Sequence, residues 1–65
     1  MRYEIRVDGQ MSKTLTEAFP ELESFVVAHQ TVLFGPVLDE AHLYGLLARF
    51  QSLGLHVAEM RRLPE

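Results

Sequence analysis

Residues 38–55 read LDEAHLYGLLARFQSLGL and carry the clearest structural signal in the chain. Asp39 is a favourable N-cap, and we expect Leu38 before it to pack on Leu43 as a hydrophobic staple. Gly54 stands where a left-handed residue often ends a helix, and Leu55 beyond it can contact Phe50, as a Schellman ending requires. The sequence therefore predicts a helix over 39–53 with one apolar face, made of Leu43, Leu46, Leu47, Phe50 and Leu53.

The two ends of the chain predict β-strands. Residues 2–7 alternate between apolar and charged side chains, as a half-buried strand does, and Asp8-Gly9 supplies turn residues directly after them. Residues 55–63 alternate less regularly, with Val57 expected on one side of a final strand and Met60 on the other.

A short helix is expected between the first strand and the middle of the chain, over residues 12–19. Thr14 followed by Glu17 fits a capping box, in which the two side chains satisfy free backbone donors at the helix start. Pro20 disfavours a helical conformation at the residue before it, so the helix has about two turns at most.

The middle of the chain predicts a β-hairpin. Residues 22–28 and 31–37 are rich in β-branched and aromatic side chains and are each too short for a helix. Only a short connector, at His29-Gln30, separates them, which favours an antiparallel pair.

These elements give the order strand, helix, strand, strand, helix, strand in a single domain over residues 1–65. Two strand–helix–strand units with right-handed crossovers, joined by a hairpin, form a ferredoxin-like α+β fold. We therefore expect a four-stranded antiparallel sheet with both helices on one face. The first strand and the strand that contains residues 32–34 should occupy the centre of the sheet.

Composition excludes several functions. The chain has 65 residues, no cysteine and a net charge of −3, so disulfides and thiolate zinc sites are impossible and no basic stripe for nucleic acid is present. No stretch is apolar enough to suggest a membrane span, and no signal peptide is visible, so we expect a cytoplasmic protein without nucleic-acid or membrane partners. A chain of this length buries only about 60% of its surface, which leaves a small margin of stability.

The segment over residues 35–43, with residues 46–49 and 53–55, resembles small uncharacterised bacterial single-domain proteins of ferredoxin-like fold. This resemblance implies a fold and no chemistry. Acylphosphatases share the fold but need an arginine in the loop after the first strand, which residues 8–13 lack. ACT-type regulatory domains carry a characteristic turn at the same place, of which Asp8-Gly9 keeps only a faint trace.

Polar residues predict no catalytic, cofactor-binding or metal site. The spacing of His29, His42 and His56 matches no metal motif. The acidic residues around Pro20 are expected to form a solvated corner, and the charged row on residues 2–6 a solvated or salt-bridged sheet face. If the protein were an enzyme without a cofactor, His42, His56 and Tyr44 would be the side chains to consider. The acidic corner comprises Glu17, Glu21 and Glu23, and the charged row Arg2, Glu4 and Arg6.

The hairpin is unusual because it is apolar on both faces, although a strand with one dry face needs apolar residues at alternate positions only. Exposed apolar patches usually mark interfaces. We therefore expect a non-catalytic interaction or regulatory domain that acts as a homodimer, with edge-to-edge and face-to-face contact both open and an unidentified protein partner as a further possibility. The alternatives are an ACT-like ligand sensor with a pocket at the dimer interface, and a small cofactor-independent dimeric enzyme. The predicted interface residues are Phe25, Val26, Val27, Val32, Leu33 and Phe34.

Overall fold

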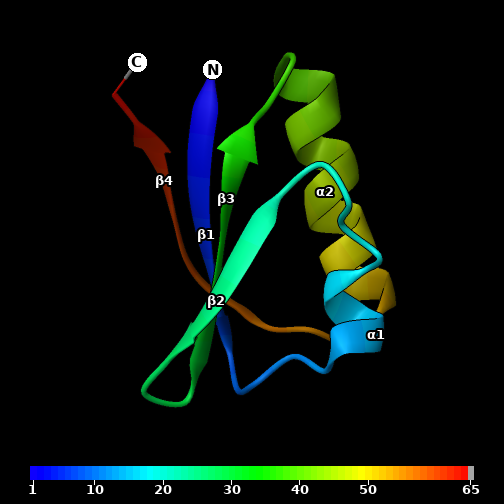
Figure 1. Ribbon diagram of the computed structural model, residues 1–65. Coiled ribbons are helices and arrows are strands. Elements are labelled where there is room, and N and C mark those ends of the chain that lie inside the picture. Colours follow the sequence, from blue (N-terminus) through cyan, green and yellow to red (C-terminus); the bar gives the residue numbers. More distant parts are fainter. Residues whose placement is uncertain (65) are drawn as a thin grey trace.

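The computed structural model describes residues 1–64 and places two helices against one face of a four-stranded antiparallel sheet (Figure 1). The strand order is β2-β3-β1-β4, so β1 and β3 are central. This arrangement confirms the predicted ferredoxin-like α+β fold. In chain order, the elements are β1 (Arg2–Asp8), α1 (Lys13–Thr16), β2 (Glu23–Val27), β3 (Gln30–Pro36), α2 (Glu40–Ser52) and β4 (Val57–Leu63).

The core lies between the sheet and α2. Ile5 of β1 pairs with Leu33 of β3, and both side chains face the helices with 1% of their surface exposed. Phe19, which follows α1, stacks on Phe50 of α2 with ring centroids 4.2 Å apart. The apolar face of α2 is narrower than predicted, because Leu47 is only partly buried and Leu53, at the C-cap, is 40% exposed. The helix residues that reach the core fully are Leu43, Leu46 and Phe50.

Both ends of α2 are closed by local hydrogen bonds. The Asp39 carboxylate accepts from the His42 N–H at 2.8 Å, as predicted for the N-cap. At the other end, Gly54 has φ of 71°, and the Leu55 N–H donates to the Phe50 carbonyl at 2.9 Å, which is the predicted Schellman ending. The predicted staple is wrong, because Leu38 is 85% exposed and its backbone N–H instead donates to Nδ1 of His42.

The first helix is shorter than predicted and has a different cap. Ser12 is the N-cap, with its hydroxyl accepting from the Leu15 N–H at 3.3 Å, whereas Thr14 lies inside the helix. Beyond Thr16 the chain tightens, since the Phe19 N–H donates to the Thr16 carbonyl three residues back. This tighter turn differs from a second helical turn and accompanies the burial of the Phe19 ring in the core.

The hairpin turns one residue earlier than predicted, at Ala28-His29. Both residues have positive φ, 33° and 70°, and Val27 pairs with Gln30 on either side of the turn. The end of β3 next to the turn is tied to the loop after β1, because the Thr31 hydroxyl accepts from the Met11 N–H at 2.9 Å and the His29 carbonyl accepts from the Gly9 N–H at 2.7 Å. Two positive φ values are those of a type I′ turn, which favours asparagine and glycine rather than alanine and histidine.

The predicted alternation of the last strand is wrong, because the pairing of β4 with β1 contains a register irregularity. The shift lies between Arg6 and Val7 of β1. It places Val57 opposite Val7 and Met60 opposite Ile5, so both side chains lie on the same face of the sheet.

Alanine substitutions of leucines on the apolar face of α2 test which of these side chains are buried. Leu46→Ala should lower the free energy of unfolding by about 2–5 kcal/mol, because a fully buried side chain is lost. Leu53→Ala, on the same helix face but 40% exposed, should cost much less. Urea denaturation followed by circular dichroism measures both, and equal losses would contradict the assignment.

Replacing Ala28-His29 by Asn-Gly should stabilise the fold. Both new residues adopt positive φ with little strain, so the free energy of unfolding should rise by about 1 kcal/mol. The melting temperature of the double variant checks this, and an unchanged or lower value would count against a type I′ turn.

Candidate functional site

The predicted interface residues separate into an exposed and a buried group. Phe25, Val26 and Val27 of β2 are 48%, 50% and 39% exposed. Val32 and Leu33 of β3 are at most 1% exposed, so their side chains offer no surface to a partner. We therefore remove these two residues from the predicted interface. Leu33 faces the helices, and Val32 faces the opposite side of the sheet, where Phe25 and Arg6 are its neighbours on the adjacent strands.

The exposed apolar side chains of the hairpin form one surface at the β2 edge of the sheet, which we call the hairpin patch: Phe25, Val26, Val27 and the half-buried Phe34. Register places Phe25, Val27 and Phe34 on the face without helices and Val26 on the helix side. The rings of Phe25 and Phe34 meet edge to face with centroids 5.7 Å apart. The patch therefore wraps around both faces of one edge strand.

The other half of the open sheet face is charged and internally paired. Nε of Arg61 donates to the Glu4 carboxylate at 2.9 Å, and Nε of Arg6 lies 3.5 Å from the same oxygen. The Arg61 hydrogen bond, aided by the charges of Arg61 and Arg6, outweighs burial and lowers the pKa of Glu4. The salt-bridged alternative predicted for this row therefore holds for Glu4 and Arg6.

The two edges of the sheet differ in how they are protected against pairing with another strand. β4 exposes Glu59, Arg61 and Arg62, and its pairing with β1 is irregular. Charged side chains and irregularities of this kind prevent edge-to-edge association. β2 has one charged residue, Glu23, and pairs with β3 in an unbroken register. With a single charged residue and no irregularity, the β2 edge is the less protected of the two.

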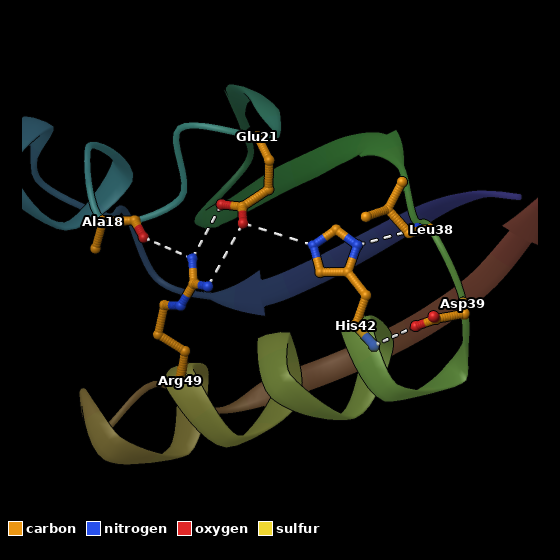
Figure 2. A network of polar contacts seen from close by, with 6 residues as sticks. All are labelled: Ala18, Glu21, Leu38, Asp39, His42 and Arg49. Carbon is orange, nitrogen blue, oxygen red and sulfur yellow. Dashed lines mark hydrogen bonds and ion pairs between the residues drawn. The ribbon is translucent and has the colours of Figure 1, made fainter.

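A polar cluster joins the segment before β2 to α2 (Figure 2). The Glu21 carboxylate accepts from Nη1 of Arg49 at 2.9 Å and lies 3.6 Å from Nε2 of His42. Nη1 of Arg49 also donates to the Ala18 carbonyl at 2.9 Å, and its guanidinium lies 5.3 Å from the centre of the Phe19 ring. Glu21 is thus held in place, in contrast to the solvated corner predicted for it, whereas Glu17 and Glu23 are exposed.

Both ring nitrogens of His42 are engaged in this cluster. Nδ1 accepts from the Leu38 N–H at 3.0 Å, which requires that Nδ1 carry no proton and places the ring proton on Nε2, facing Glu21. A general base needs a ring nitrogen that is free to take a proton from a substrate. In this arrangement His42 tethers the start of α2 to Glu21 and offers no such nitrogen.

Gly35 makes room for this cluster. A Cβ atom at Gly35 would lie 3.1 Å from the Glu21 carbonyl oxygen and 3.1 Å from a methyl carbon of Leu22. The absence of a side chain lets the segment before β2 pass close over β3, which brings Glu21 within reach of Arg49.

The remaining candidate polar residues lie in separate surroundings. Nδ1 of His56 is 2.6 Å from the Asp8 carboxylate at the solvent-exposed start of β4, His29 is exposed in the hairpin turn, and Tyr44 is 62% exposed on α2. Within residues 1–64, no group of three or more histidine, aspartate or glutamate side chains could hold a metal ion. No helix in the same part of the chain has the length and apolar character needed to cross a membrane.

The Glu21 cluster predicts a specific dependence of stability on pH. Burial opposes ionisation of Glu21, but the Arg49 hydrogen bond and charge, a backbone hydrogen bond and His42 outweigh it and lower its pKa below the ordinary value of 4.5. The stabilisation is therefore complete above the unfolded-state pKa and lost as pH falls through the lower pKa of the folded state.

Glu21→Gln should reduce the free energy of unfolding at neutral pH, and the gap to the unmodified protein should close as the solution is acidified below about pH 4.5. Glu17→Gln, an exposed control from the same segment, should change the free energy of unfolding at neutral pH much less. Urea denaturation over a pH series measures both, and a Glu21→Gln profile parallel to that of the unmodified protein would refute the stabilising role of the carboxylate.

Comparison with known proteins supports a family but no activity. No curated protein and no solved structure is detectably similar to the chain. A family model described as a domain of unknown function, DUF8691, matches residues 2–61, which include both helices, β1, β2, β3 and most of β4. The chain belongs to the DUF8691 family.

Proposed function

We propose that the protein is a small non-catalytic interaction domain that acts as a homodimer, with the hairpin patch as its contact surface. The observation that carries this proposal is the exposure of apolar side chains on both faces of β2. Phe25 and Val27 project from the open face and Val26 from the helix side, each more than a third exposed. Removing such surface from water favours association by about 25 cal/mol per Å² of apolar area.

A second copy of the chain suits this surface by charge. The chain carries a net charge of −3, but β2 contributes only Glu23 to it. Two copies that meet at β2 therefore keep most of their like charges away from the contact. A two-fold dimer uses the same patch on both chains, which is the commonest closed arrangement of identical subunits.

The small core adds a second reason for a partner. Short chains bury a low fraction of their surface, and this one has no disulfide to add stability. Covering the hairpin patch would add apolar burial that the two helices do not supply. Association of folded copies also stabilises each fold by mass action.

Light scattering coupled to size exclusion tests the proposal. At micromolar concentration the protein should have twice its 7.4 kDa chain mass. Phe25→Lys should shift the mass toward the monomer, because it places a charge in the contact. Tyr44→Lys is a matched control, since it places the same charge at an exposed aromatic position on α2, outside the patch, and should leave the dimer intact.

A monomeric mass for the unmodified protein would overturn the homodimer. Loss of the dimer in both lysine variants, with circular dichroism unchanged, would overturn the assigned surface. A thermal-shift screen against amino acids, nucleotides and metals addresses the non-catalytic part of the proposal, because a ligand that binds the folded state raises its melting temperature. A clear shift would favour a ligand sensor or an enzyme.

A further inference from the structure

Resting on the proposed homodimer, we infer that its contact is made edge to edge. β2 of one copy pairs antiparallel with β2 of a second copy, with Phe25 on the two-fold axis, and the two sheets join into one of eight strands. Backbone direction, register and side-chain placement each support this geometry.

The backbone of β2 has unpaired groups that point away from the sheet. The Gly9 N–H donates to the His29 carbonyl at 2.7 Å, which fixes the odd-numbered residues of β3 as those bonded toward β1. The even-numbered residues of β3 then bond to their partners in β2, which are Glu23, Phe25 and Val27. Ser24 and Val26 consequently direct their N–H and C=O groups to the open edge.

Only one antiparallel register pairs the whole strand with itself. With Phe25 opposite Phe25 of the second copy, Ser24 lies opposite Val26, and these two outward-facing residues exchange backbone hydrogen bonds. Glu23 then faces Val27, so no like charges are opposite each other. Sliding one step toward Glu23 puts Ser24 opposite Ser24 and makes the two Glu23 carboxylates diagonal neighbours on the same face. Sliding one step the other way draws in Ala28, whose φ of 33° is not extended.

Side chains on both faces of β2 are used in this register. On the open face the two Phe25 rings meet as a non-hydrogen-bonded pair, with Cα atoms about 4.5 Å apart. Each ring already contacts Phe34 of its own chain, so four aromatic rings would form a row across the axis. On the helix side, Ser24 of the second copy lies opposite Val26 and covers it. A face-to-face dimer would bury Phe25 but leave Val26 exposed, and the β4 edge, with its exposed charges, is unsuited to pairing.

Hydrogen exchange of the unmodified protein provides the first test. The Ser24 and Val26 amides should exchange slowly in the dimer and about tenfold or more faster on dilution to the monomer, since pairing alone protects them. The Phe25 amide, which bonds to β3, is the internal control and should respond much less. Fast exchange at Ser24 and Val26 in a sample that light scattering shows to be dimeric would overturn edge pairing and leave the homodimer standing.

Cysteine cross-linking provides the second test, because the chain has no cysteine of its own. Phe25→Cys places two sulfurs across the axis at a separation that a disulfide can span. Val27→Cys, on the same face of the same strand, places them four residues apart along the strand direction, about 13 Å, which a disulfide cannot span. Mild oxidation should cross-link the first variant only. Cross-linking of Val27→Cys at least as fast would overturn the register.

Discussion

The packing of α2 against β1 and β3 is the contact on which the rest of the structure depends. Leu46 and Phe50 of the helix meet Ile5 and Leu33 of the sheet, and Phe19 completes this core by stacking on Phe50. Residues 1–64, which the structure describes, form two helices, and both lie on one side of the sheet (Figure 1). Neither helix covers the opposite face or the two edges. The side chains of the strands must therefore stabilise these surfaces, or the surfaces stay exposed.

The strands solve this problem in two different ways. Around β1 and β4, arginine and glutamate side chains neutralise one another, and exposed charges block the outer edge. Around β2, the side chains are apolar and the backbone edge is free of such charges except at Glu23. The cluster of Glu21, His42 and Arg49 fixes the segment that leads into β2, so this apolar edge is held against the body of the protein. An apolar edge that is held in place and carries a single charged residue is the physical basis of the proposed self-association.

Local sequence signals predicted the fold because the ends of α2 and the alternation of β1 depend on neighbouring residues. Two errors were local, since the Leu38 staple and the cap of the first helix were wrong within a few residues. The others arose where distant contacts decide the structure. The residues beside the hairpin turn bond to the loop after β1, about 20 residues away in sequence, and the Glu21 cluster joins residues 28 apart. The burial of Val32 was also not predicted from the sequence. It depends on the neighbouring residues of β1 and β2 on either side of β3, and not on the hairpin alone. The position of Arg49 near the C-terminus of α2 indicated a favourable interaction with the helix dipole, but no sequence pattern indicated Glu21 as its partner.

The most direct test of the central claim is an isotope-filtered nuclear Overhauser measurement on a sample that mixes labelled and unlabelled chains. Such a measurement detects only protons of different copies that lie close together. Antiparallel pairing about Phe25 predicts a contact between the Phe25 Hα protons of the two copies, because Cα atoms of a non-hydrogen-bonded pair approach most closely. Contacts between copies that are confined to side chains on the open face, with none between β2 backbones, would contradict the account.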